Sequence, residues 1–245
     1  MSDAPREQAT EVPAEPPAEP GTHLRVAVVL LVAASGAVET ISFTALDHVF
    51  AGVMTSNLAL LGMAVGRSQA TGVTAAVLAL AGFGLGAAVS ARCTRRHGGT
   101  AMHWSRPVLL CLAGEALLLA VGAVVWAVLG GTPGRAARDA LQFGAALTMG
   151  VQSGAMVAAG RAAAPTTYLT GTLATYIVKG VGAGRPSRWV PVRLGALIAG
   201  AAACMAVLRS APGWAGLLPP GLVVCALLSA GAPAIRARRA APGGK

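Results

Sequence analysis

Eight apolar segments occupy most of the chain after residue 22, and they restrict its fold more than any other feature. Most are long enough to cross the roughly 30 Å hydrocarbon core of a bilayer, which takes about 20 helical residues. Only 11% of the residues are charged, against about 25% in soluble domains. A backbone in hydrocarbon must satisfy its own hydrogen bonds, so we predict an all-α, polytopic helical membrane protein. The segments are residues 24–46, 49–66, 70–91, 106–130, 138–160, 166–184, 190–209 and 216–236.

Both ends of the chain differ from this apolar body. Residues 1–22 are rich in Pro, Glu, Ala and Thr and contain no Leu, Ile or Phe, which predicts a disordered acidic, Pro-rich tail. The acidic start is unlike the basic start of a cleaved signal peptide, so we expect the first apolar segment to be retained. We place the membrane domain at residues 23–236 and a basic cytoplasmic tail at residues 237–245.

A short polar phrase occurs twice inside the apolar sequence, as Thr55-Ser56-Asn57 and as Thr170-Gly171-Thr172. Glycines flank both copies at nearly the same distances: Gly36 and Gly86 for the first copy, Gly150 and Gly200 for the second. We interpret this pattern as an internal repeat, with half one at residues 24–130 and half two at residues 138–236. In membrane transporters, interrupted segments at corresponding positions of two halves mark a binding site between them.

The distribution of positive charge bears on the number of spans. With eight full spans and a cytoplasmic start, thirteen of the 19 Lys and Arg residues lie inside. If the second and sixth segments instead enter and return on one side, fifteen lie inside, which fits the positive-inside rule better. We therefore predict about six full spans plus two broken or re-entrant helices, with eight spans as the alternative. Three spans per half would make the two halves inverted relative to each other.

The formal net charge of +10 could indicate nucleic acid, but the arginines cluster at the ends of apolar segments and lack interleaved aromatic residues. This placement is typical of cytoplasmic loops that set the orientation of a membrane protein, so we expect no nucleic-acid partner. The four cysteines show no paired spacing, and we expect neither disulfides nor a metal site. They are Cys93, Cys111, Cys204 and Cys225. Nothing in the sequence indicates a cofactor.

Two stretches resemble signatures of one known family. The first runs from Ser35 to Phe43 and continues through Val49-Phe50 and Met54 to Leu58; the second combines residues 149–153 with residues 166–173. Together they resemble the YoaK-like family of bacterial integral membrane proteins, which carry a domain of unknown function. The resemblance implies a fold and a location in the bacterial cytoplasmic membrane, and it brings no established activity.

This chain departs from the family pattern at two positions. Glu39 stands where the family usually has Asp, which keeps the charge. Ser56 stands where the family usually has Gly, which adds a Cβ and a hydroxyl group. If that glycine serves a backbone with positive φ at a helix break, Ser56 is in conflict with such a geometry.

Two acidic residues lie inside apolar segments, where an ionisable group is costly and is a functional candidate by default. Glu39 is predicted to be a proton acceptor or cation ligand; the alternative is a hydrogen bond to a neighbouring Thr or backbone amide that fixes helix packing. Glu115 is predicted to act in a proton relay with Glu39, or to pair with Arg or Lys across helices. The position of half two that corresponds to Glu39 is near Ser153, with Gln152 beside it, so the charge is not duplicated.

The leading hypothesis is a small-solute or ion transporter with its site between the repeated halves. The predicted pathway residues are Glu39, Thr55, Ser56, Asn57, Glu115, Gln152, Thr170, Gly171 and Thr172. The alternative is a non-transporting membrane partner or assembly factor, whose polar residues hold helices together. We expect no enzyme, because the sequence shows no nucleophile, base and acid in a catalytic arrangement. The expected partners are the lipid bilayer and an unknown small solute or ion; the sequence does not indicate an oligomeric state.

Overall fold

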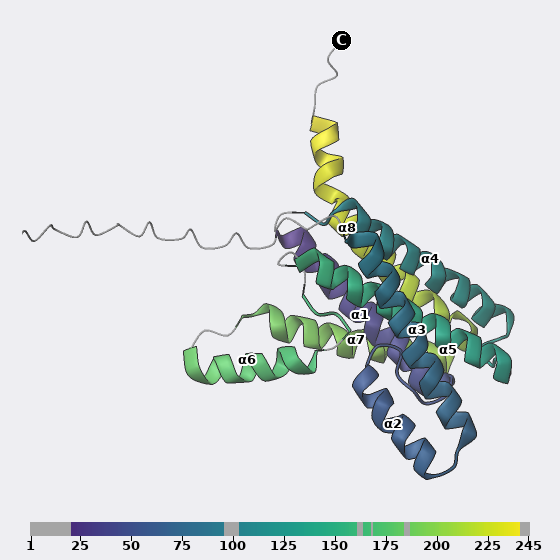
Figure 1. Ribbon diagram of the computed structural model, residues 1–245. Helices are drawn as coiled ribbons and strands as arrows, with labels where there is room; N and C mark the ends of the chain where they lie inside the picture. The colour runs from purple at the N-terminus through teal and green to yellow at the C-terminus, as the bar shows by residue number, and fades with distance from the viewer. Residues whose placement is uncertain (1–20, 96–102, 161–163, 168, 184–186, 241–245) are drawn as a thin grey trace, which may run out of the picture.

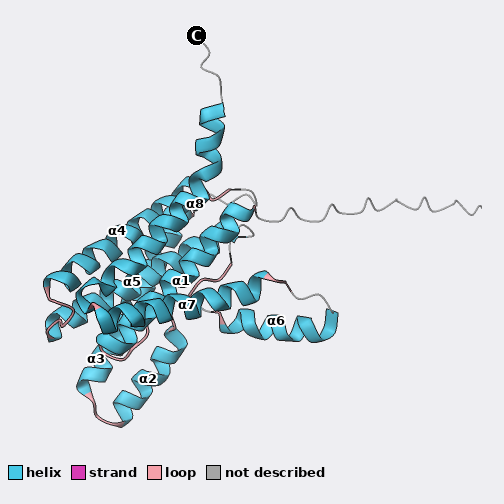
Figure 2. Ribbon diagram, turned by 180° about the vertical axis from the view of Figure 1, so that it is seen from behind, coloured by secondary structure: helices cyan, strands magenta, loops and turns pink. Residues whose placement is uncertain are grey.

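The computed structural model describes residues 21–95, 103–160, 164–167, 169–183 and 187–240. Of the predicted tails, residues 1–20 and 241–245 lie outside these ranges, whereas residues 237–240 belong to the last helix. Where it is described, the chain is helical (Figures 1 and 2). The helices are α1 (Thr22–Ala45), α2 (Met54–Gly66), α3 (Ala70–Thr94), α4 (Arg106–Val128), α5 (Arg135–Ala159), α6 (Thr170–Ala183), α7 (Trp189–Ser210), the 3-10 helix η2 (Pro212–Leu217) and α8 (Leu218–Ala240).

Helix length divides these elements into two groups. Five stretches are long and apolar enough to span a bilayer: α1, α3, α4, α7 and residues 212–231 of η2 and α8. α5 is a sixth long helix of 25 residues, although charged residues in its first turns make it more polar. By contrast, α2 has 13 residues and α6 has 14. At 1.5 Å per residue they reach only about 20 Å, short of the 30 Å core. The prediction of an all-α polytopic membrane protein is confirmed.

The two ends of α4 illustrate how local sequence sets a helix boundary. Pro107 lies in the first turn, where its missing N–H breaks no helical bond. The helix ends before Gly130 and Gly131, whose φ angles of 64° and 76° are readily adopted only by glycine. The amide of Gly131 donates to the carbonyl of Trp126 at 3.0 Å and closes the last turn.

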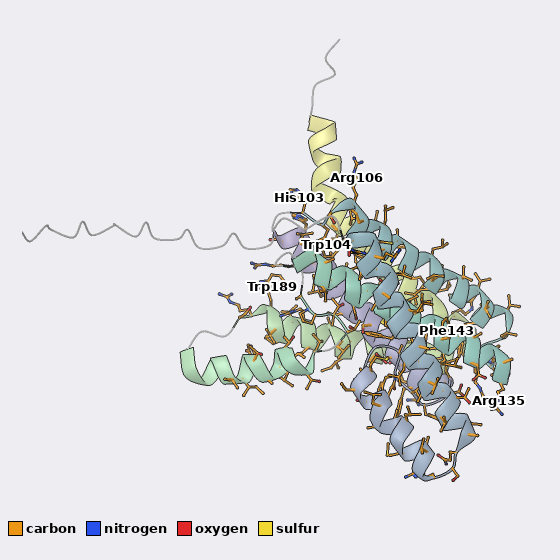
Figure 3. The ribbon with its side chains drawn as sticks, in the orientation of Figure 1. His103, Trp104, Arg106, Arg135, Phe143 and Trp189 are labelled. Atoms are coloured by element: carbon orange, nitrogen blue, oxygen red, sulfur yellow. The ribbon has the colours of Figure 1, made fainter. Side chains whose placement is uncertain are left out.

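One ring contact distinguishes six spans from eight. The rings of His23, at the start of α1, and His103, just before α4, have centroids 6.4 Å apart. Three crossings before α4 would place these residues on opposite sides of a bilayer, whereas two crossings place them on the same side. Figure 3 shows His103, Trp104, Arg106 and Trp189 at this end of the bundle and Arg135 at the opposite end. The structure therefore agrees with the six-span topology.

Helices far apart in the sequence form the tightest pairs. α1 packs mainly against α7 and α8, and α3 packs against α5. Glycines permit the close approach: a Cβ on Gly86 of α3 would collide with the carbonyl of Leu147 in α5, and a Cβ on Gly200 of α7 with the carbonyl of Ala33 in α1. Within the α3–α5 pair, Gly82 lies against Phe143 and Ser90 against Gly154, so these two helices run parallel.

α2 and α6 extend away from the bundle that the long helices form (Figures 1 and 2). α2 lies against the first part of α3, and α6 touches α7. The predicted segments at 49–66 and 166–184 were therefore too long as helices. In each, the helix begins several residues later, after residues that are not helical where the structure describes them.

Candidate functional site

The chain that follows α1 folds back beside that helix before α2 begins. Glu39 lies six residues before the end of α1, yet its carboxylate accepts hydrogen bonds from the amides of Ala51 at 2.8 Å and Gly52 at 2.7 Å. Ser42 donates to the carbonyl of Val49 at 2.6 Å. Residues 49–52 are thus held at the depth of Glu39, and this segment is a re-entrant loop. We call residues 46–53 the first loop.

The chain that follows α5 repeats this course with different side chains. Gln152 donates from Nε2 to the hydroxyl of Thr166 at 2.7 Å, and the hydroxyls of Ser153 and Thr167 are hydrogen bonded to each other. α5 continues to Ala159, so this loop also returns to a level inside the bundle. We call residues 160–169 the second loop, of which 160, 164–167 and 169 are described.

The two loops meet inside the protein. A Cβ placed on Gly52 would lie 3.3 Å from the Cβ of Thr167, 3.5 Å from that of Met149 and 2.9 Å from Oε1 of Glu39. Gly52 and Thr167 are both buried. We call this cluster, formed by Glu39, Gly52, Met149, Ser153 and Thr167, the loop junction. It joins residues from both predicted halves.

Each short helix begins next to the loop junction. Asn57, in the first turns of α2, accepts from the amide of Phe50 at 2.9 Å and donates to its carbonyl at 2.6 Å. Asn57 is fully buried, so this pair of bonds fixes the first loop to the start of its helix. In the second loop, Leu169 accepts the first helical bond of α6, from Leu173 at 2.8 Å. The positive ends of two helix dipoles therefore lie close to the junction.

The predicted pathway residues fall into two groups. Glu39 lies in the loop junction, Gln152 and Asn57 each hold one of its loops, and Glu115 is buried in α4. The remaining residues of the repeated phrases lie in the first turns of the short helices, and their side chains are not part of the junction. Thr55, Thr170 and Gly171 are exposed, and Ser56 and Thr172 are half-buried.

Ser56 does not conflict with the backbone around it. It lies in the first turn of α2, and the described non-glycine residues with positive φ are His48 and Ser68. The break in the chain is therefore made by the loop before Met54, and the serine adopts an ordinary helical conformation.

Glu115 differs from Glu39 in its surroundings. Its side chain has no exposed surface, and neither carboxylate oxygen has a hydrogen-bond partner among the described residues. Its neighbours in α4, Leu112 and Ala116, belong to the main apolar core. The ion pair with Arg or Lys that the sequence left open as an alternative is not formed with any described residue.

Sequence reasoning left Ser153, Thr166, Thr167 and Gly52 out of the predicted set. A usable signal existed for Ser153, because it stands 114 positions after Glu39, the same separation as between Gly36 and Gly150. The two threonines precede the second copy of the polar phrase as Ala51 and Gly52 precede the first. What the sequence could not show is that the loops, rather than the phrases, make the contact between the halves.

One ion pair lies at the end of the bundle where α1 stops. Asp47 pairs with Arg138 at 3.5 Å, and both side chains are partly exposed. Partial burial raises the pKa of Asp47 above its usual 3.8, against the opposing effect of Arg138. These two residues lie at the protein surface and are not part of the loop junction.

Comparison with known proteins places the chain in a family. The family model described as "Protein of unknown function (DUF1275)" matches residues 27–229, which include both loops and all eight helices in whole or part. The UPF0700 transmembrane protein YoaK of Bacillus subtilis (strain 168) is 33% identical over 148 residues, which are 60% of this chain and 63% of that protein. The alignment thus spans less than two thirds of that relative. No solved structure matches. The chain is an integral membrane protein that belongs to the DUF1275 family, as its likeness to the YoaK-like signatures predicted.

Proposed function

We propose that this protein carries a small solute or an ion across the bacterial cytoplasmic membrane, through a site between two inverted repeats. In this proposal the substrate is moved without covalent change. The observation that carries the proposal is the loop junction, where a re-entrant loop from each half meets the other beside the start of a short helix. Broken helices that meet between inverted repeats are the usual construction of substrate sites in secondary transporters.

The packing of the long helices supports the repeat. Gly36 and Gly200 form the contact between α1 and α7, and Gly150 and Gly86 form the contact between α5 and α3. These are the four glycines that flank the two polar phrases. Each pair joins the first helix of one half to the third helix of the other, so a twofold exchange of the halves maps one contact onto the other.

The side chains that hold the loops follow the same correspondence. Glu39 bonds to Gly52 in the first half, and Ser153 bonds to Thr167 in the second. The separations within the pairs are 13 and 14 positions. A duplication that retained the fold while the contacting side chains diverged accounts for this arrangement.

The junction offers a solute hydroxyl groups and two helix N-termini rather than an array of charges. Hydroxyl groups act as donors and acceptors, and the helix ends favour negative charge or the oxygen atoms of a neutral polar solute. In the described residues, Glu39 is the ionisable group at this point. A small polar solute or ion fits such a site better than a large apolar compound.

Glu39 also supplies a means of coupling transport to protons. An ionised carboxylate is a strong acceptor for the amides of Ala51 and Gly52, and protonation weakens both bonds. A proton on Glu39 would therefore release the first loop from α1 and open the junction on one side. Glu115, buried and without a described partner, is the second acidic group that such a proton path would use.

The same hydrogen bonds also fit the alternative role, a non-transporting membrane partner or assembly factor. Both oxygens of Glu39 already have partners within the protein, which is the arrangement expected of a structural residue. Under this alternative, release of the loop has no consequence for any solute, and the junction only stabilises the fold.

Uptake into proteoliposomes distinguishes the two roles. We expect purified protein to accumulate one class within a panel of radiolabelled small solutes and ions, with a pH gradient increasing the rate. Glu39→Gln removes the titratable group and keeps the size of the side chain, so the pH effect should be lost in this variant. Glu39→Asp, which restores the residue usual in the family, is the matched control and should retain it.

Two results would contradict the proposal. If no solute in the panel is taken up by folded protein, the transporter role is wrong. If Glu39→Gln transports with an unchanged response to the pH gradient, Glu39 is not the coupling group, and the junction acts without proton exchange.

A further inference from the structure

A second feature of the bundle lies on the side of α5 that faces α4. A cavity of about 390 Å³ is enclosed by the end of α1, by α4 and α5, and by the turn from η2 into α8. Its lining includes Leu118, Val121 and Val125 of α4, which are 46%, 54% and 40% exposed. The cavity therefore opens on the outer face of the bundle between α4 and α5, within the span of two long helices.

The lining of the cavity is apolar, and its few polar groups already have partners. The indole N–H of Trp126 donates to the carbonyl of Pro212 at 2.7 Å, and the hydroxyl of Thr148 donates to the carbonyl of Ala145 at 2.7 Å. A water molecule needs two to four polar partners to be retained in a cavity, and this lining does not supply them. An empty cavity would leave its walls without dispersion contacts. A hydrocarbon chain can make these dispersion contacts, and the lipid around the opening can supply it.

Charge at one end of the cavity indicates how its occupant is oriented. Ala137 lines the cavity, and α5 begins two residues earlier at Arg135, whose side chain is exposed. Figure 3 shows Arg135 at the end of the bundle. Lipid headgroups lie at the ends of helices that span the hydrocarbon core. The guanidinium group is well suited to bind a phosphate. Arg138, one turn further along, is paired with Asp47.

We propose that this cavity is a binding site for one membrane phospholipid, with an acyl chain between α4 and α5 and the phosphate at Arg135. The volume lies within the range of about 300–1,000 Å³ that is usual for ligand sites. The site does not depend on transport. It nevertheless adjoins the loop junction, because Val38 and Thr148 line it and are neighbours in sequence of Glu39 and Met149. The bound chain would fill a space that walls from both halves enclose.

Two glycine substitutions test the site with the same chemical change. Gly144 lines the cavity, and a Cβ there meets no atom within 4 Å, so Gly144→Leu adds an apolar side chain at the cavity wall with no collision at its Cβ. Gly84 of α3 is the matched control, because it is exposed, also has open space, and does not line the cavity. Native mass spectrometry of detergent-purified protein in phosphatidylglycerol should show one retained lipid in the wild type and in Gly84→Leu. We expect retention to fall about tenfold in Gly144→Leu.

Fluorescence gives a second measurement that does not depend on lipid retention. Trp126 lines the cavity and is 2% exposed, so annular lipids do not reach its ring directly. In a variant that carries Trp104→Phe, Trp189→Phe and Trp214→Phe, phosphatidylglycerol brominated on its acyl chains should quench Trp126 strongly. Addition of Gly144→Leu should reduce this quenching at least about twofold, because the leucine displaces the chain. Addition of Gly84→Leu should leave it unchanged.

The charged end is tested by Arg135→Gln, with Arg67→Gln as the control on the loop between α2 and α3. We expect Arg135→Gln to weaken phosphatidylglycerol retention about threefold or more and Arg67→Gln to have no effect. Equal retention in Arg135→Gln and wild type would overturn the assignment of the phosphate. Equal retention and quenching in Gly144→Leu and wild type would overturn the site. The protein could also form a stable dimer in which Trp126 is protected from the brominated lipid and loses that protection when the dimer dissociates. That result would assign the cavity to a second copy of the chain and would also overturn the proposal.

Discussion

The first and second loops occupy corresponding places in the chain, but different chemistry holds each of them. A carboxylate that accepts from two backbone amides anchors the first loop, whereas neutral side chains hydrogen bonded to threonines anchor the second. The first anchor changes strength when Glu39 gains a proton, and the second does not titrate. The comparison teaches that two loops at corresponding places in the chain can be anchored by different chemistry, with a titratable carboxylate in the first and neutral side chains in the second.

The largest expected effect tests whether the two halves share one packing scheme. Gly86→Leu in α3 and Gly200→Leu in α7 each place a side chain against the backbone of a neighbouring helix, so each should destabilise the protein by about 3 kcal/mol or more. Thermal unfolding in detergent measures both, with Gly84→Leu as a control that should stay within about 0.5 kcal/mol of the wild type. A large effect in one half and none in the other would show that the packing is not symmetric.

The next effect measures the difference between the two anchors. Glu39→Ala leaves the amides of Ala51 and Gly52 without acceptors and should lower the free energy of unfolding by about 2–3 kcal/mol. Ser153→Ala removes one neutral hydrogen bond to Thr167 and should cost about 1 kcal/mol. Chemical unfolding in mixed micelles gives both values. Equal losses would remove the distinction between the loops.

A smaller effect concerns the repeated polar phrases themselves. Asn57→Ala should cost about 2 kcal/mol, because it strips the backbone of Phe50 of both its side-chain bonds inside the protein. Thr172→Ala, in the corresponding turn of α6, should cost less than about 0.5 kcal/mol because that side chain is half-buried. The melting temperatures of the two variants check this order, and a larger loss for Thr172→Ala would reverse it.

The smallest effect is the pH dependence of stability that arises from Asp47. Partial burial raises the pKa of Asp47 in the folded protein, so the contribution of this group to stability is fully present below its unfolded value of 3.8 and is lost as pH rises through the folded value. Asp47→Asn should therefore lessen the fall in melting temperature above about pH 4. The pair with Arg138 is partly exposed, so the change should be a degree or two at most. An identical pH profile for variant and wild type would assign no role to this carboxyl group.

Much of the fold was accessible from the sequence because membrane burial leaves a strong signal. The apolar segments predicted every long helix to within a few residues at most ends, and the arginine distribution favoured the topology that the contact between His23 and His103 supports. The start of α2 was misplaced, because residues 49–53 are apolar and were included in the segment although they form a loop. Hydropathy reports depth in the membrane and cannot distinguish a helix from a loop buried in protein.

The candidate site was less accessible for a related reason. Glu39 was found because a lone carboxylate in an apolar segment stands out, and its bond to a backbone amide was one of the interpretations considered. Thr55 and Thr170 were selected as polar residues in apolar surroundings, but their side chains are exposed on the short helices. The groups that meet at the junction include Gly52 and Met149, whose position depends on how two loops fold back. No pattern along the chain encodes that distance.

The pairing of α1 with α7 and of α3 with α5 also affects the order in which the protein is made. When half one has emerged from the ribosome, α1 is complete. Its partner α7 lies more than 150 positions further along the chain and has not yet been synthesised. The face of α1 around Gly36 then stays without its partner in the bilayer until α7 is inserted, and contacts over such separations form slowly. Half one alone should therefore be a substrate for membrane quality control. Two halves expressed as separate chains should recover a stable protein only when both are present.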